Sequence, residues 1–227
     1  MKVIIISDIH GNYDALSSIN DDYDKMIFLG DAVDYGPEPD LVIDYLRDKS
    51  DINIMGNHDN AVVYNTDCMC SFDMHELSEI TRKEITMKLL DKNDINYMKG
   101  FKNYSEFDID NKRFYATHGS PLNNLNGYLF ATEAELLYKK REFTQNYDFI
   151  LVGHTHFMMM YRNKIINPGS AGQPRDLNYM PSYVLYDSDK NTFTFKRFNY
   201  NYENVLKKLR SLLDYDTYNK IKVFYSP

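Results

Sequence analysis

The sequence has little of several features that mark particular classes of protein. Its 227 residues include two cysteines and no tryptophan, and no apolar run approaches the ~18 residues of a membrane-spanning helix. A disulfide scaffold or a zinc-knuckle framework needs more cysteines than this. The first apolar run is interrupted by Asp8 and His10, which is typical of a strand and not of a leader peptide. We therefore expect a reduced, cytoplasmic protein with no membrane partner.

Positive charge is also in deficit. The chain has 26 Lys and Arg residues against 33 Asp and Glu residues, which gives a formal net charge of −7. Binding to an extended nucleic acid uses a broad cationic face, so we expect no such partner. What the chain does have is a globular balance of 43% hydrophobic and 26% charged residues. At this length that balance predicts a single domain over residues 1–227.

Short apolar runs alternate with helical patterns along the N-terminal part. Runs over residues 2–7, 25–29 and 52–55 predict buried parallel strands, and helices are predicted between them. This alternation is typical of an α/β fold, whose ligands bind at the carboxyl ends of the strands. The two helices between these strands are predicted over residues 13–19 and 40–49, and further helices over residues 74–98, 131–143 and 202–213. Further strands are predicted over residues 104–109, 113–117, 149–152, 158–162, 164–166, 183–186 and 192–198.

Polar motifs directly follow the predicted strands, and they contain five of the six histidines. The motifs are Asp8-Ile9-His10, Gly30-Asp31, Gly56-Asn57-His58-Asp59, Thr117-His118-Gly119 and Gly153-His154-Thr155-His156. Carboxylates together with imidazoles suit borderline divalent ions such as Mn, Fe or Zn, whereas Mg and Ca prefer oxygen alone. Because one carboxylate can bridge two ions, these donors predict a centre of two divalent metal ions, with Mn and Fe favoured.

The ordered motifs resemble those of the calcineurin-like metallophosphoesterase superfamily. Residues 167–175, with the sequence NPGSAGQPR, resemble a segment of its bacterial and archaeal branch of predicted phosphoesterases. The resemblance implies a four-layer αββα sandwich of two mixed β-sheets flanked by helices, with the metal centre between the sheets. It implies that one ion is held by Asp8, His10, Asp31 and His156. It implies that the other is held by Asp31, Asn57, His118 and His154, with Asp31 bridging.

Three residues near these donors receive other interpretations. In the scheme that the resemblance implies, His58 binds no metal, and we expect it to donate a proton to the leaving oxygen. Asp34 resembles the carboxylate that orients this histidine in the related phosphoprotein phosphatases, or it begins a turn or helix. Asp59 is predicted to be a helix cap.

Two residues are candidates for contact with the substrate phosphate. Arg175 follows a Gly/Ser/Pro loop, and its guanidinium either clasps phosphate oxygens or pairs with Asp176 on the surface. Asn12 either donates to phosphate or caps a helix, and capping is the preferred interpretation.

The resemblance implies a metal-dependent phosphoesterase that hydrolyses small phosphodiester or nucleotide substrates by attack of a hydroxide bridging the two metals. The alternatives are a dinucleoside polyphosphate hydrolase acting on diadenosine tetraphosphate, a phosphomonoesterase or protein phosphatase, and a non-catalytic scaffold. Tyr35 stands where the protein phosphatases carry a phosphate-gripping arginine, which weakens that alternative. A helical insertion over residues 60–103 is expected to act as a lid. The Tyr-rich segment 215–225 packs either on the body or on a second subunit of a homo-oligomer.

Overall fold

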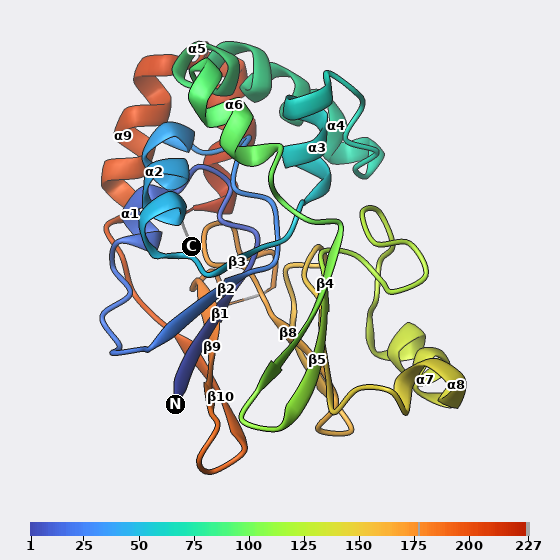
Figure 1. Ribbon diagram of the computed structural model, residues 1–227. Coiled ribbons are helices and arrows are strands. Elements are labelled where there is room, and N and C mark those ends of the chain that lie inside the picture. The colour runs from blue at the N-terminus through green and yellow to red at the C-terminus, as the bar shows by residue number, and fades with distance from the viewer. Residues whose placement is uncertain (177, 226–227) are drawn as a thin grey trace.

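Two five-stranded sheets form the centre of the molecule, which is a computed structural model that describes residues 1–176 and 178–225 (Figure 1). The first sheet has the strand order β10 (Thr192–Arg197), β9 (Ser182–Asp187), β1 (Lys2–Ile6), β2 (Lys25–Phe28), β3 (Ile52–Asn53). The second has the order β4 (Tyr104–Ile109), β5 (Lys112–Thr117), β6 (Phe149–Leu151), β8 (Ile165–Pro168), β7 (Met158–Tyr161). Both sheets are mixed, because parallel strands β1, β2, β3 and β5, β6, β8 are extended by antiparallel partners.

The sheets pack face to face through alternate residues of their strands. In β1, Val3 and Ile5 face the second sheet, where they join a core cluster that includes Phe114. Ile4 and Ile6 point the other way and pack with the helices. Both faces of β1 are therefore buried, which explains why its sequence is a continuous β-branched run and does not alternate with polar residues.

Helices cover the outer faces of both sheets. In Figure 1, α1 (Tyr13–Leu16), α2 (Pro39–Lys49) and α9 (Tyr202–Leu212) lie beside the first sheet. α7 (Ala131–Lys139) and α8 (Arg141–Thr144) lie beside the second, where Ala134 and Leu137 pack on Tyr115 and Ile150. The prediction of a four-layer αββα sandwich is confirmed. In the described part of the chain, no helix is both long enough and apolar enough to cross a membrane.

A third group of helices lies over the carboxyl ends of the parallel strands (Figure 1). It comprises α3 (Asn57–Tyr64), α4 (Phe72–Thr81), the π-helical turn η1 (Arg82–Thr86), α5 (Met87–Leu89) and α6 (Lys92–Met98). Met74 and Leu77 of α4 pack with Val205 of α9 and with Ile221, the last residue of α10 (Tyr215–Ile221). Segment 215–225, which ends with η2 (Lys222–Phe224) and the buried Tyr225, therefore packs on the body.

Several predicted elements end earlier than expected or are divided, including the helical region 74–98, which is divided into α4, η1, α5 and α6. Helix α1 ends at Leu16 because the hydroxyls of Ser17 and Ser18 donate to the carbonyl oxygen of Asp14 and compete with the helical pattern. Strand β3 ends at Asn53, after which Ile54 bridges to Lys102 of a different segment. The helix predicted over residues 131–143 is divided into α7 and α8 by a non-helical residue at position 140.

Candidate metal centre

The predicted metal donors come together where the parallel strands end. Asp8 follows β1, Asp31 follows β2, His118 follows β5, and His154 follows β6. Two groups of donor atoms lie within 4.8 Å of one another: Asp8 with His10 and His156, and Asp31 with His118 and His154. Every one of these side chains is buried. Donor residues that are spread from position 8 to position 156 thus meet in one small polar cluster, which lies in the otherwise apolar interface between the two sheets.

The backbone of the cluster is strained in the same way at six residues. Their φ angles are positive, in the left-handed region that residues other than glycine seldom adopt: Asp8 54°, His10 49°, Asp31 64°, Asp34 65°, His154 66° and His156 61°. Such conformations persist where the surrounding fold imposes them, and they gather at functional sites. Each one turns the chain sharply after a strand and so aims the side chain at the common centre.

Gly56 and Asp59 hold the loop that carries Asp31. A Cβ atom on Gly56 would lie 2.1 Å from Asp31 Oδ1, so only glycine allows this approach. Asp59 accepts hydrogen bonds from the backbone N–H groups of Asp31 and Ala32, both at 2.8 Å, and of Gly56 at 3.0 Å. Asp59 does not stand before the helix as a cap: it lies in the first turn of α3, whose N-cap is Gly56, and its bond to the Gly56 N–H forms a capping box. The two bonds to the Asp31 loop were not predicted. In the sequence, Asp59 directly follows Asn57 and His58, which are candidates for chemical roles, so the motif does not indicate that Asp59 has a purely structural role.

The first donor group has two imidazoles in a fixed orientation. His10 Nδ1 donates to the carbonyl oxygen of Val33 at 3.0 Å, and His156 Nδ1 donates to that of Gln173 at 2.6 Å. Because a carbonyl oxygen only accepts, both Nε2 atoms are left with lone pairs. These Nε2 atoms face each other at 3.3 Å, and His156 Nε2 is also 3.3 Å from Asp8 Oδ1. Electron pairs that converge in this way need a cation between them.

The second donor group repeats this pattern. His118 Nδ1 donates to the carbonyl oxygen of Leu29 at 2.8 Å, and its Nε2 lies 3.0 Å from Asn57 Oδ1 and 3.2 Å from Asp31 Oδ2. Burial acts against charge on His118, yet the carboxylate of Asp31 raises its pKa to about 9. The surrounding oxygens therefore favour a positive charge at this point. His154 completes the group, with its ring centroid 4.9 Å from that of His118.

Asp31 lies between the two groups. Its Oδ2 is 3.2 Å from His118 Nε2 in one group and 3.8 Å from His10 Nε2 in the other. Burial opposes the charged form of Asp31, but the imidazoles of His118 and His58 hold its pKa well below the usual range. Its other oxygen accepts the backbone N–H of His58 at 2.9 Å. An ionised carboxylate in this position can contribute to two sites at once.

The donor set fits two borderline divalent ions. Asp8 Oδ1 and His154 Nε2 are buried and have no hydrogen-bond partner among residues 1–176 and 178–225. Burial raises the pKa of Asp8 to about 7 and lowers that of His10 to about 3, because the described charges around them offset the effect of burial only in part. Bound cations supply that balance, and carboxylate, amide and imidazole ligands are the mixture that such ions accept.

A hydrogen-bonded network holds His58 at the edge of the cluster. His58 Nδ1 lies 2.9 Å from Asp34 Oδ2, which also accepts Arg82 Nη2 at 2.7 Å and Ser78 Oγ at 3.3 Å. Asp34 Oδ1 accepts Thr86 Oγ1 at 3.2 Å. Burial lowers the pKa of His58, but Asp31 and Asp34 outweigh it and raise the pKa overall. The geometry is that of a carboxylate that orients a histidine.

Sequence reasoning missed Ser78, Arg82 and Thr86. They lie on α4 and η1, 44, 48 and 52 positions beyond Asp34, where no local pattern indicates their role. The π-helical turn that begins at Arg82 is a structural indication of a functional role for these residues, because such turns occur often at functional sites.

Arg175 lies beside the cluster, and its surface interpretation is wrong. Its Nη2 donates to Gln173 Oε1 at 2.8 Å, and its guanidinium lies 5.7 Å from the centre of the Tyr35 ring. Asp176, the partner expected on the surface, instead accepts Arg197 Nη1 at 3.2 Å. Burial lowers the pKa of His156, and the charge of Arg175 is the next largest cause. This guanidinium therefore acts electrostatically on the donors.

Asn12 is engaged within the protein. Its Oδ1 accepts the backbone N–H of Ala15 at 3.0 Å and so caps α1, and its Nδ2 donates to the carbonyl oxygen of Gly172 at 2.7 Å. The side chain is fully buried. Asn12 thereby ties the loop after β1 to the glycine-rich loop that precedes Arg175.

An exposed row of aromatic side chains leads away from His154. The ring centroid of Tyr128 is 4.2 Å from that of His154 and 6.0 Å from that of the parallel Phe130 ring, which in turn contacts Phe157. Tyr128, Phe130 and Phe157 are 39%, 43% and 41% exposed. We call these three residues the aromatic platform. It unites two loops that are distant in sequence, so sequence reasoning missed it.

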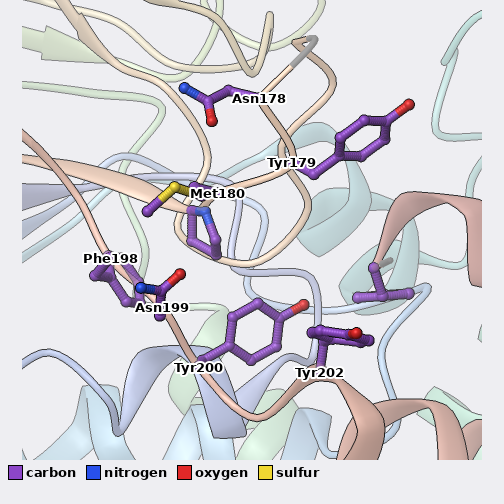
Figure 2. A pocket seen from close by; sticks show the side chains of 9 residues that line it. Asn178, Tyr179, Met180, Phe198, Asn199, Tyr200 and Tyr202 are labelled. Atoms are coloured by element: carbon purple, nitrogen blue, oxygen red, sulfur yellow. The ribbon is translucent and has the colours of Figure 1, made fainter. Parts of the chain in front are cut away.

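A separate cavity of about 120 Å³ lies between residues 178–181 and the segment after β10 (Figure 2). It is lined by Asn178, Tyr179, Met180, Pro181, Phe198, Asn199, Tyr200, Tyr202 and Tyr225. None of these described residues belongs to the predicted donors. The cavity is therefore not part of the cluster, although its first lining residue follows Arg175 by three positions.

Known proteins resemble this chain over nearly its whole length. A model of the calcineurin-like phosphoesterase superfamily domain matches residues 1–191, a range that includes every predicted donor and Arg175. An uncharacterised protein of Methanocaldococcus jannaschii is 27% identical over 232 positions, which cover 91% of each chain. The crystal structure of a metallophosphoesterase from Sphaerobacter thermophilus aligns with a TM-score of 0.81 and 25% identity, covering 97% of this chain and 98% of that one. A hypothetical protein from Pyrococcus horikoshii aligns with a TM-score of 0.80 and 20% identity, over 99% and 97% of the two chains.

Proposed function

Since this chain belongs to the calcineurin-like phosphoesterase superfamily and is a phosphoester hydrolase, we propose that it hydrolyses small phosphodiesters that carry a nucleobase. The observation that supports this substrate class is the aromatic platform, whose first member, Tyr128, packs directly on His154 of the donor cluster. A phosphate bound at the cluster would place an attached aromatic group within reach of these rings. Stacking of a base on an aromatic side chain contributes about 1–3 kcal/mol.

The metal-binding residues in this proposal are those that the motifs indicated. One divalent ion would be held by Asp8, His10, Asp31 and His156, and a second by Asp31, Asn57, His118 and His154. The chemistry supplied at this cluster by two such ions would be Lewis acidity toward the phosphoryl oxygens and toward the attacking water. Mn and Fe are the favoured ions.

The protein's own contribution to bond cleavage is a positioned proton. His58 would donate it to the leaving oxygen, and Asp34 would hold the imidazole through Nδ1, which leaves Nε2 for the substrate. Arg175 would bind a phosphoryl oxygen and offset the charge that develops there. Its position over Tyr35 and beside Gln173 keeps the guanidinium in place.

We also propose that the helical segment over residues 60–103 covers the substrate site and determines its shape. It carries Ser78, Arg82 and Thr86, which hold Asp34, and α4 packs on the C-terminal helices. Because that packing is extensive and apolar, the segment would stay in place during turnover. This segment would mainly fix the position of His58 and limit the size of the leaving group that the site accepts.

A protein phosphatase is disfavoured by the place of Tyr35. The ring is fully buried, with its centroid 4.9 Å from that of His10 and 5.0 Å from that of His58. Position 35 therefore supports the imidazoles and presents no cation to a phosphorylated side chain. A dinucleoside polyphosphate is the second candidate substrate, because Phe130 extends the platform beyond Tyr128 and offers a surface to a second base.

A substrate panel with Mn²⁺ tests the proposal. Bis-p-nitrophenyl phosphate is expected to be hydrolysed faster than p-nitrophenyl phosphate, and thymidine 5′-p-nitrophenyl phosphate faster than either. Diadenosine tetraphosphate in the same panel tests the second candidate. Faster turnover of the monoester would contradict the diesterase assignment, and no turnover of any compound would indicate a non-catalytic scaffold.

A further inference from the structure

Both cysteines of the chain lie beside His58. Cys68 and Cys70 belong to the segment that links α3 to α4, and both are free thiols. Their sulfur atoms and one ring nitrogen of His58 all lie within 4.8 Å of one another. Cys68 is 1% exposed, and Cys70 is partly buried. The proposed hydrolysis uses neither thiol, so this cluster has no role in the chemistry described above.

The three side chains form a ligand set of a different kind from the main cluster. Thiolate and imidazole together favour soft or borderline ions such as Cd²⁺ and Zn²⁺, whereas the carboxylates of the main cluster also accept harder ions such as Mn²⁺. A tetrahedral ion with sulfur ligands at about 2.3 Å and a nitrogen ligand at about 2.0 Å places those atoms about 3.5–3.8 Å apart. The cluster therefore needs a contraction of about 1.0–1.3 Å at most, with the fourth position left to water.

The surroundings keep these ligands in place. The side chain of Asn57 donates to the carbonyl oxygen of Cys68 at 2.8 Å, and Ser78 Oγ lies 3.5 Å from Cys68 Sγ. His58 is held by Asp34, and a carboxylate behind a histidine is a common feature of metal sites. Two thiolates balance the charge of one divalent ion, so binding adds no net charge beside the buried Asp34 carboxylate.

We propose that Cys68, Cys70 and His58 bind a single thiophilic divalent ion, and that this ion inhibits hydrolysis by withdrawing His58 from the reaction. An imidazole that coordinates a metal through one nitrogen can no longer carry a proton on both nitrogens. It therefore ceases to be the acid that protonates the leaving oxygen. The inhibition rests on the function proposed above for His58, whereas the binding of the ion does not.

Cd²⁺ is a suitable probe, because its bonds to thiolates absorb in the ultraviolet and the chain has no other cysteines. The reduced protein, kept in excess Mn²⁺, is titrated with Cd²⁺. We expect a thiolate-to-metal absorption band that reaches its plateau at one Cd²⁺ per chain. An absent band at excess Cd²⁺, or a plateau at one Cd²⁺ per two chains, would overturn the site.

Variants test the ligands one at a time. Cys70→Ser is expected to weaken Cd²⁺ binding at least about tenfold and to reduce the band. His58→Gln retains both thiols, and it too should weaken binding at least about tenfold if its circular dichroism spectrum is unchanged. Unchanged affinity in His58→Gln would show that the histidine is not a ligand and would overturn the three-residue site.

The inhibition is measured separately. Cd²⁺ at the concentration that saturates the band should lower the turnover of the wild-type protein in excess Mn²⁺. Cys70→Ser should retain the turnover measured without Cd²⁺ and should resist this concentration. Equal inhibition of both proteins would overturn the inhibitory part. If the protein hydrolyses no substrate at all, the proposed function fails, and the absorption band still decides whether the ion binds.

Discussion

Asp59 Oδ2 accepts a hydrogen bond from the backbone N–H of Asp31 at 2.8 Å, and the two residues are 28 positions apart. The same carboxylate accepts N–H groups from Ala32 and Gly56. It thus fixes the left-handed turn that carries Asp31, whose Oδ2 lies 3.2 Å from His118 Nε2 and 3.8 Å from His10 Nε2. One buried side chain, bonded through both oxygens to backbone N–H groups, sets the position of the residue that would bridge the proposed centre.

The first prediction concerns this contact. Asp59→Asn replaces one acceptor oxygen with an amide donor, which would face backbone N–H groups that already donate. Leaving a buried donor unsatisfied costs about 1–3 kcal/mol, so we expect the free energy of unfolding in urea to fall by that amount. Asp91→Asn is the matched control, because Asp91 caps α6 at an exposed site and asparagine is an equally good cap. Equal losses in both variants would contradict a special role for Asp59.

The second prediction concerns metal content. After reconstitution with Mn²⁺ and removal of free ions, elemental analysis is expected to find about two ions per chain in the wild-type protein. Asp8→Asn should retain about one ion, whereas Asp31→Asn should retain almost none, because Asp31 Oδ2 lies close to both donor groups. A chelator should abolish turnover, and Mn²⁺ should restore it. Two ions retained in Asp31→Asn would exclude a bridging role.

The parts of the molecule that the sequence predicts well depend on neighbouring residues. The β-branched run of β1 is buried on both faces, so its hydrophobic pattern reports its environment directly. The donors after β1, β2 and β3 could be brought together for a similar reason, because the carboxyl ends of parallel strands in one sheet meet at the same edge. The donors after β5 and β6 belong to the second sheet, and only the family resemblance predicted that they join the first group.

The contacts of Asp34 could not be predicted in this way. Arg82 is the first residue of the π-helical turn that follows α4, and it reaches Asp34 across 48 positions, a separation over which no local pattern links the two residues. Tyr128 meets His154 only because two loops after different strands come together. Left-handed backbone at Asp8 and His156 is likewise imposed by the fold, because residues other than glycine adopt it in only a small minority of cases, although aspartate and histidine do so more often than most.

The third prediction concerns the proposed proton donor. His58→Ala is expected to lower kcat about 10²- to 10⁴-fold for an ester with a nucleoside leaving group, with unchanged metal content. The loss should be smaller for a p-nitrophenyl ester, because p-nitrophenolate leaves without protonation. His75→Ala is the control, since His75 is an exposed histidine paired with Asp67. Loss of bound metal in His58→Ala would instead place His58 among the ligands, a role that its proximity to His10 and Asp31 also permits.

The fourth prediction concerns the aromatic platform. Tyr128→Ala is expected to raise KM for a nucleoside phosphodiester about 5- to 150-fold, the equivalent of about 1–3 kcal/mol of stacking, whereas Tyr128→Phe should keep most of the affinity. KM for a dialkyl phosphodiester should not change, because that substrate has no ring to stack. Tyr179→Ala is the matched control: Tyr179 is 41% exposed, against 39% for Tyr128, but lines the separate cavity of Figure 2. A loss confined to Tyr179→Ala would place the base in that cavity and not on the platform.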